Sequence, residues 1–381
     1  MKKLLVMLLM LTIGIAATGC KGEDIKNIQT EPLVQTASQD AWTSTFQLCW
    51  NEFIKLVGTE KIEYVEGNPP LADELNKQLF TKDDLSEDSY YISVTKQTLK
   101  HKKEIEKAIK EKFNETSDIL DSFEFENIAD EKTNKWFIYS MLLKNFKFIK
   151  PYSILDSQYF NNEEGQKYKF FGYTFAAEDK KNQPLRESYT ESLFYANDND
   201  FAVKFSDKNN KDEIILYLTS SDKSFDEIYL EMLEKSANKN EYSQKRIEEI
   251  QAKSSYPVAV KFKNYYKIPF IHIDEELNFD KELAQKDIKD KTYDTTGYTW
   301  EILKTLQTIK FDLDNEGAKL KSEAGMSVMM KTSLAPVREI DINNLYYFDR
   351  PFVIFMKEKG KDKPYFAARI KDGKYLVKDE Q

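Results

Sequence analysis

Three side chains with metal-binding chemistry alternate along one predicted strand. His272, Asp274 and Glu276 would share one face of an extended chain, because the side chains of a strand point alternately to its two faces. An imidazole beside two carboxylates suits a hard divalent cation. A polar strand end exposed to solvent explains the same residues without a metal, and the sequence holds no further readable ligand cluster. We therefore expect no metal and no cofactor.

The residues that most enzymes use for catalysis are scarce in this chain. Only two histidines are present, and His101 lies in a charged predicted helix, where we expect it at the surface. Cys49 lies beside the apolar face of another predicted helix and is interpreted as a core residue. The sequence has no phosphate-binding glycine loop, no nucleophile elbow and no metalloprotease helix motif. The sequence therefore predicts a protein that is not an enzyme.

Cys20 carries the clearest chemical signal of the N-terminal region. Lys2 and Lys3 precede an apolar run from Leu4 to Ala17, which is shorter than the about 20 residues of a membrane span and suits a signal peptide. The small residues before Cys20 resemble the lipobox of bacterial lipoproteins. That resemblance implies cleavage before Cys20, acylation of this cysteine with chains such as palmitate, and a location in the bacterial cell envelope facing the periplasm or the cell exterior. An ordinary signal peptide with a chance cysteine is the alternative.

These features divide the chain into three parts. Residues 1–19 are the predicted signal peptide, residues 20–44 a polar lipidated tether, and residues 45–381 a folded domain. As a flexible coil of about 24 residues, the tether would span about 25 to 30 Å. With Cys20 acylated, only Cys49 remains, so no intrachain disulfide can form and the fold must depend on its core.

The composition supports an ordered globular protein. The 381 residues are 41% hydrophobic and 13% aromatic, which is enough to bury a sizeable core. A net charge of −9 argues against nucleic acid as a partner, because phosphate binding needs lysines and arginines that acidic residues do not offset. We expect a monomer.

The segment from Leu306 to Met356 combines two unlike patterns. Thr308–Leu313 and Leu345–Met356 are rich in aromatic and β-branched residues and predict buried strands. About thirty residues between them show no helical period, which is long for a connection inside a domain. The first half alternates, with one side formed by Ala318, Leu320, Ser322, Ala324, Met326 and Val328. A loop with the period of a strand suggests a segment that is exposed in one state and added to a sheet in another.

The remaining elements predict an α+β fold, with helices early and strands late. The expected helices are Phe46–Val57, Leu71–Phe80, Lys96–Phe113 and Phe225–Lys235. The apolar run Trp136–Ile149 is either a helix or a central strand. The other expected strands are Tyr90–Thr95, Tyr168–Phe175, Ser192–Tyr195, Phe201–Phe205, Glu213–Thr219, Pro257–Phe262, Tyr265–Ile273, Pro364–Ile370 and Lys374–Val377.

Two motifs in the last third resemble the serpin family of protease inhibitors. Asp314–Lys319 resembles the family's hinge, with acidic residues before a glycine and a small residue after it. Tyr347–Phe352, followed by Val353–Met356, resembles the family's C-terminal signature, and Pro364–Ile370 its final strand. The resemblance implies a large central mixed β-sheet, packed helices and an exposed reactive-centre loop, here from Gly317 to about Asn343.

The resemblance extends upstream to about Tyr90, with two notable substitutions. Ile268–Ile273 resembles the family's proline-led core strand, and Lys144–Tyr152 its central strand leading into the region called the breach. Phe148 stands where the breach usually has a tryptophan, and Gln307 where the region called the shutter usually has a histidine. The segment before Tyr90 is too short for the family's full set of early helices.

The function implied by the resemblance is suicide inhibition of serine or cysteine endopeptidases. The family's spacing places the reactive bond at Lys331–Thr332, and a lysine there suits the acidic pocket of a trypsin-like protease. Met330–Lys331 and Arg338–Glu339 are the alternatives. The moving hinge comprises Glu316, Gly317, Ala318, Leu320, Ser322 and Ala324.

The residues after the hinge glycine leave a second function open. Inhibitory members carry small residues there, whereas Lys319, Leu320, Lys321 and Glu323 interrupt that run in this chain. The charged side chains all fall on the side that would face solvent after insertion. The alternative is a non-inhibitory, serpin-like binding or scaffold lipoprotein.

Overall fold

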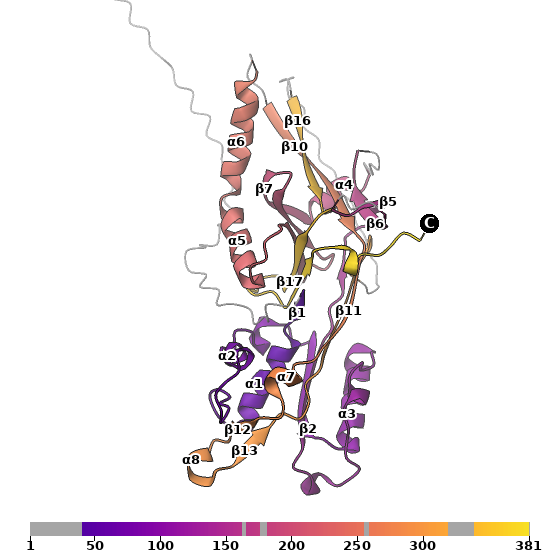
Figure 1. Cartoon of the computed structure of the whole chain (residues 1–381). Helices are drawn as coiled ribbons and strands as arrows, with labels where there is room; N and C mark the ends of the chain where they lie inside the picture. Colours follow the sequence, from indigo (N-terminus) through magenta and orange to yellow (C-terminus); the bar gives the residue numbers. More distant parts are fainter. Residues whose placement is uncertain (1–39, 162–164, 176–180, 255–258, 319–338, 381) are drawn as a thin grey trace, which may run out of the picture. The chain divides into compact units, whose positions relative to one another are not determined.

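A computed structural model describes residues 40–161, 165–175, 181–254, 259–318 and 339–380 (Figure 1). The predicted signal peptide, the predicted lipidation site at Cys20 and most of the predicted tether lie outside these residues. Strand β1 (Ala41–Thr43) is the first element of the described chain.

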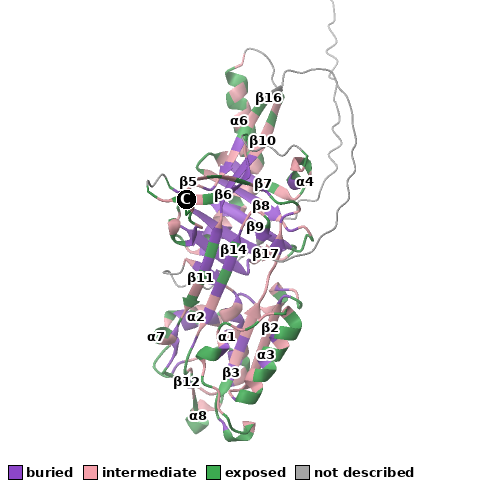
Figure 2. Ribbon diagram, turned by 90° about the vertical axis from the view of Figure 1, so that its right-hand side faces the viewer, coloured by how far each residue is buried: buried purple, intermediate pink, exposed green. Residues whose placement is uncertain are grey.

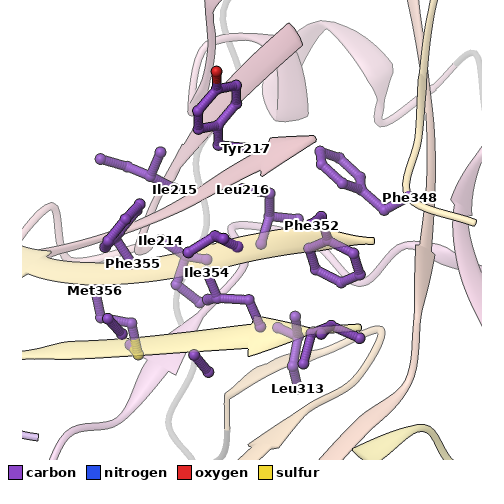
Figure 3. Packing of buried hydrophobic residues seen from close by; sticks show 14 of the residues in the cluster. Ile214, Ile215, Leu216, Tyr217, Leu313, Phe348, Phe352, Ile354, Phe355 and Met356 are labelled. Atoms are coloured by element: carbon purple, nitrogen blue, oxygen red, sulfur yellow. The ribbon is translucent and has the colours of Figure 1, made fainter. Parts of the chain in front are cut away.

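The largest sheet has six strands and is antiparallel throughout. Its two central strands are covered on both faces, as expected for nearly continuous apolar runs (Figure 2). Figure 3 shows side chains of these strands packed with Leu313 and Phe348 from other elements. In spatial order the strands are β1, β18 (Phe366–Ile370), β17 (Phe352–Glu358), β9 (Asp212–Leu218), β8 (Asp200–Ser206) and β7 (Thr190–Asn197).

A four-stranded mixed sheet packs against the six-stranded sheet. Two of its strands run parallel to each other, and the other pairings are antiparallel. Tyr266 lies 5.7 Å from Phe205 and Tyr346 lies 5.3 Å from Phe201, measured between ring centroids. In spatial order the strands are β16 (Glu339–Tyr347), β10 (Ala259–Pro269), β6 (Lys167–Tyr173) and β5 (Ser153–Tyr159).

The other strands form four separate pairs. The long apolar run that suits either a helix or a strand is a strand, interrupted between its two parts β3 and β4. The pairs are β2 (Tyr90–Lys96) with β3 (Trp136–Leu142), β11 (Ile271–Leu277) with β14 (Gln307–Leu313), β4 (Phe146–Lys147) with β15 (Gly317–Ala318), and β12 (Asp287–Lys289) with β13 (Thr299–Glu301).

Helices cover the strands in three apolar clusters. Helix α5 packs on the six-stranded sheet, where Phe225 and Tyr229 contact Phe355. Helix α1 ends at Gly58 in the left-handed conformation, as a helix stop requires. The helices are α1 (Thr45–Val57), α2 (Pro70–Asn76), α3 (Leu99–Phe113), α4 (Gln183–Glu187), α5 (Phe225–Ala237), α6 (Lys239–Ala252), α7 (Asp280–Leu283) and α8 (Tyr293–Thr296). Within the described ranges, no helix has the length and apolar character needed to span a membrane.

The α+β class is confirmed, and two predicted boundaries are wrong. Residues 40–44 do not belong to a tether, because Ala41 pairs with Ala368 and the Trp42 ring packs against Phe80. The burial of Trp42 holds residues 40–44 against the folded domain, although this segment is polar on average. The predicted loop does not extend to Asn343, since β16 begins at Glu339 and pairs in parallel with β10.

Candidate functional site

The predicted hinge begins with a tight turn after β14. Asp314 accepts hydrogen bonds through Oδ1 from the backbone nitrogens of Glu316, at 2.8 Å, and Gly317, at 3.1 Å. The backbone nitrogen of Asp314 donates to the carbonyl of Gly317 at 3.0 Å. A carboxylate that accepts from its own turn stabilises the reversal of the chain. The acidic residue of the motif therefore has a structural role.

Gly317 lies where only glycine fits. Its φ angle is +132°, a region that L side chains rarely adopt. A Cβ atom at this position would lie 2.6 Å from the carbonyl oxygen of Phe146 and 2.7 Å from the Cα of Lys147. The hinge glycine is thus required by the close approach of two backbones.

The hinge is docked on the segment that leads away from β3. Gly317 pairs with Lys147 and Ala318 with Phe146. The backbone nitrogen of Phe148 donates to Glu316 at 3.1 Å. This short ladder connects the chain of β14 to the chain of β3, while β3 and β14 themselves share no ladder in the described part of the protein.

Asn315 adds two further hydrogen bonds between the hinge and the segment that follows β4. Its carbonyl accepts from the backbone nitrogen of Tyr152 at 2.8 Å, and its side-chain amide donates to the Tyr152 carbonyl at 3.2 Å. The motif resemblance does not single out Asn315 or Tyr152. Their positions inside the motifs Asp314–Lys319 and Lys144–Tyr152 are the sequence signal that points to them.

An aromatic cluster lies beneath the docked hinge. The Phe148 ring lies 4.9 Å from Tyr152 and 5.6 Å from Phe205 between centroids. Arg186 lies 5.0 Å above the Tyr152 ring and donates to the carbonyl of Pro151. Burial raises the pKa of Tyr152 to about 12, so its hydroxyl stays neutral. Phe148 and Tyr152 thus pack together in one aromatic cluster with Phe205.

Gln307 ties the start of β14 to the N-terminal elements. Its side-chain amide donates to Thr45 Oγ1 at 2.8 Å and to Thr43 Oγ1 at 3.2 Å. Gln307 is buried. An amide does not titrate, so this contact keeps its charge state at every pH where the protein is folded.

The candidate metal ligands are not brought together into a site. His272 Nδ1 lies 2.7 Å from Asp312 Oδ1 on the paired strand, and both side chains are exposed. Asp274 and Glu276 follow on the same exposed face of β11. Among the residues that the structure describes, no group of three or more histidine, cysteine or carboxylate side chains is arranged to hold a metal ion.

Two other residues with side chains that could take part in catalysis are Cys49 and His101. Burial raises the pKa of the Cys49 thiol to about 11, which disfavours the nucleophilic thiolate. His101 is expected at the surface, and the structure shows it only partly exposed. Its Nδ1 lies 3.0 Å from Thr98 Oγ1 and 3.3 Å from Asp130 Oδ1, and its side chain is 15% exposed. Partners from a neighbouring turn shield it, which helix periodicity alone does not reveal.

The proposed reactive bonds fall mainly outside the described residues. Glu339 is the exception, because its backbone begins β16 and pairs with Ala259. An Arg338–Glu339 bond would therefore adjoin a paired strand. Glu316 is exposed, and Ala318 contributes its backbone to β15. The other predicted positions that fall outside are Leu320, Ser322, Ala324, Met330, Lys331, Thr332 and Arg338.

Several solved structures are similar to parts of this chain. A thermophilic serpin, tengpin, in the native state is 14% identical with a TM-score of 0.37, covering 76% of this chain and 75% of tengpin. Human glycosylated kallistatin is 11% identical with a TM-score of 0.41, covering 71% of this chain and 63% of kallistatin. Serpin48 of the insect Tenebrio molitor is 13% identical with a TM-score of 0.35, covering 76% and 78%. No family model and no curated protein matches the sequence.

All three likenesses have TM-scores below 0.5 and carry no argument about the fold family of this chain. The segments singled out by the sequence resemblance occur as the docked hinge, the strands β17 and β18, and the end of β10 with the start of β11. The expected central strand Lys144–Tyr152 is present only as the two-residue strand β4. At identities of 14% or less, the likeness also says nothing of activity. What the predicted hinge can do follows from its own contacts.

Proposed function

We propose that this chain is a suicide inhibitor of serine or cysteine endopeptidases. The observation that supports this function most is the incomplete pairing around the hinge. In the described chain β14 pairs only with β11, β3 pairs only with β2, and two residue pairs join the hinge to β4. The residues after Ala318 have the alternation of a strand and could extend that ladder between β14 and β3.

The proposed chemistry is acyl transfer to the protease followed by strand insertion. The protease nucleophile attacks the carbonyl carbon of Lys331, the bond to the Thr332 nitrogen breaks, and that nitrogen leaves as an amine after taking a proton from the protease's general acid. The freed loop then enters the sheet. About ten new ladder bonds at roughly 1 kcal/mol each would supply about 10 kcal/mol.

The register of the docked hinge agrees with the alternation of the loop. Continued beyond Ala318, the pairing of Gly317 with Lys147 would set Ser322 opposite Leu142 and Ala324 opposite Ser140. Ser140 donates to the carbonyl of Thr45 at the start of α1, so this face of β3 is directed to α1, whereas Phe137 and Tyr139 on the opposite face are buried against α3. The small side chains would enter on the side of α1, and the charged ones on the side of α3.

Incubation with trypsin tests the proposed inhibition. We expect loss of protease activity and a covalent complex that survives a denaturing gel. Lys331→Ala should abolish this complex, whereas the matched variant Arg338→Ala should retain it. A cleaved loop beside fully active trypsin would reject inhibition of trypsin-like proteases. Loss of the complex in Arg338→Ala alone would move the reactive bond to Arg338–Glu339.

A non-inhibitory binding role is the second candidate. It is favoured by Lys319, Lys321 and Glu323, which must be desolvated or rearranged while a strand enters the sheet. Because inhibition depends on insertion before hydrolysis of the acyl intermediate, any slowing of insertion converts an inhibitor into a substrate. Normal cleavage with no gain in heat stability would support this role.

We further propose that the chain is anchored in a bacterial membrane through lipid on Cys20. The support is the sequence alone, in which small residues precede Cys20 and an apolar run precedes them. In a bacterial host, Cys20→Ser should shift the protein from the detergent phase to the aqueous phase after phase separation. Equal partitioning of the wild type and Cys20→Ser would reject the lipid anchor.

A further inference from the structure

A lysine interrupts the apolar run that forms β3 and β4. Lys144 lies between these two strands, where the ladder with β2 has ended. Its ammonium group lies 3.0 Å from Asp212 Oδ1 on β9 and forms a second ion pair with Glu358 on β17. The side chains of Lys144, Asp212 and Glu358 are 10%, 9% and 8% exposed. Three charges are thus shielded together at one point of the fold.

Further polar groups complete this cluster. Ser86 donates to Glu358 through its backbone nitrogen at 2.9 Å and through its hydroxyl at 2.7 Å. The Tyr365 hydroxyl donates to Asp212 at 3.2 Å, and the Lys144 ammonium lies 4.9 Å from the centre of the Tyr365 ring. Buried charges are tolerated when opposite charges and hydrogen bonds surround them.

The two carboxylates respond differently to this environment. Burial raises the pKa of Asp212 above its ordinary value, in spite of Lys144. Burial acts in the same direction on Glu358, but hydrogen bonds from Lys144 and Ser86 outweigh it and hold the pKa of Glu358 below its ordinary value. Glu358 is therefore the more firmly ionised partner of Lys144.

The turn between β8 and β9 makes a second connection to β4. The backbone nitrogen of Lys208 donates to the carbonyl of Lys147 at 2.8 Å. The turn itself is fixed by the buried Asp207, whose Oδ1 accepts from the backbone nitrogens of Lys211, at 2.6 Å, and Asp212, at 3.2 Å. One turn thus contacts β4 directly at Lys147 and holds Lys144 through Asp212.

The hinge occupies the other edge of β4. Successive residues of a strand direct their backbone groups to opposite edges. The carbonyl of Lys147 faces the β8–β9 turn, and the backbone nitrogen of Phe148 faces Glu316 in the hinge. Gly317 approaches this edge so closely that a Cβ would lie 2.6 Å from the Phe146 carbonyl. A small displacement of β4 would therefore change the fit of the hinge.

We propose that Lys144 is a positioning residue for the hinge. Its ion pairs with Asp212 and Glu358 fix β4 against the six-stranded sheet, so that the free edge of β4 stays in place to pair with Gly317 and Ala318. The role concerns the docked hinge, and it goes beyond the proposed function because it holds whether or not the loop inhibits a protease.

Hydrogen exchange of the full chain tests this role. In Lys144→Met the backbone amides of Phe148 and Tyr152, which donate to the hinge, should exchange about tenfold faster or more, since removing one member of a buried ion cluster leaves the others uncompensated. Peptides from the β8–β9 ladder should keep their rates. Lys144→Arg, which retains the charge, should restore slow exchange in peptides spanning residues 146–152.

Lys204→Met is the matched control. Lys204 joins Glu191 on β7 and Glu213 on β9 at 3.0 and 3.1 Å, and neither of these carboxylates lies on β4. We expect no change at residues 146–152 in this variant. If the exchange rate at residues 146–152 rose equally in Lys204→Met and Lys144→Met, the effect would be general destabilisation. That result would overturn the proposal.

Glu358→Gln decides the question if Lys144→Met does not fold. The amide keeps the shape of the carboxylate and can accept from Ser86, but it cannot neutralise Lys144. Faster exchange at residues 146–152 supports the proposal, and wild-type exchange in a folded Glu358→Gln overturns it. A chain that shows the exchange effect but forms no covalent protease complex would reject inhibition and retain the role of Lys144.

Discussion

The six-stranded sheet and the strand pairs around the hinge differ in how completely their edges are paired. β17 makes seven residue pairs with β9 and five with β18, and both of its faces are buried. β14 makes seven pairs with β11, and its other edge has no ladder partner within the described ranges. Similar apolar residues thus form a closed sheet in one region, in the sense that its inner strands have both edges paired, and an incomplete sheet in the other. The free edge of β14 offers a place for a further strand, whereas β17 already has a partner on each side.

Cleavage of the loop should have the largest effect on this difference. If the freed loop inserts beside β14, about 10 kcal/mol of new pairing should raise Tm by about 15 °C. Calorimetry of the intact chain and the trypsin-cleaved chain measures this shift. An unchanged Tm after complete loop cleavage would mean that the hinge region stays incomplete and that the loop does not insert.

Removal of a core ring should destabilise the closed sheet next most strongly. Phe355 is fully buried and contacts Phe225 and Tyr229 of α5. Phe355→Ala should lower the free energy of unfolding by about 3–5 kcal/mol, because it removes apolar area and leaves a cavity. Urea denaturation measures the change.

Ile154→Ala is the control for this core substitution. Ile154 lies on the edge strand β5 and is 69% exposed, so its truncation should change stability by less than about 0.5 kcal/mol. Equal losses in the two variants would contradict the view that the closed sheet is the scaffold.

A side chain at the hinge glycine should have a smaller and more local effect. Gly317→Val should destabilise the docked hinge relative to the undocked hinge by about 1–3 kcal/mol. Valine is strained at a φ of +132°, and its Cβ would meet the backbone of Phe146. The hinge should undock while the six-stranded sheet stays folded. Proteolysis within residues 314–318 should accelerate, with the urea midpoint nearly unchanged. Equal protection in both proteins would show that the close approach of Gly317 is not needed for docking.

The smallest expected effect concerns the pH dependence of the closed region. Burial acts against the charge of Glu231 on α5, but hydrogen bonds from Lys223, Lys235 and Tyr217 prevail and lower its pKa to about 2. A depressed carboxylate pKa contributes stability that is present above the ordinary value near 4.5 and is lost as the pH falls towards 2.

Glu231→Gln tests the sign of this contribution. The variant should be less stable than the wild type at pH 6, and the two should converge by pH 2, as measured by Tm across the series. A difference that persists unchanged at pH 2 would mean that packing, rather than charge, is the contribution of Glu231.

The sequence pattern predicted most of the strands of both regions but not their pairing. The alternation and aromatic content of Leu345–Met356 and Thr308–Leu313 identify buried strands, and the structure has β16, β17 and β14 there. The sequence did not decide between a helix and a strand for Trp136–Ile149, because a run covered on both faces shows neither the helical nor the strand period. The break between β3 and β4 arises where Lys144 joins charges from β9 and β17, which are distant in the chain.

The sequence by itself determined the α+β class, the hinge motif and the glycine at its centre, because these depend on local periodicity and on residues adjacent in the chain. Only the tertiary structure decided that the hinge docks on β4, that Asn315 bonds Tyr152, and that Lys144 is held by Asp212 and Glu358. Those contacts join segments up to 214 residues apart. Their geometry follows from how the sheets pack, and no local pattern of residues encodes that distance.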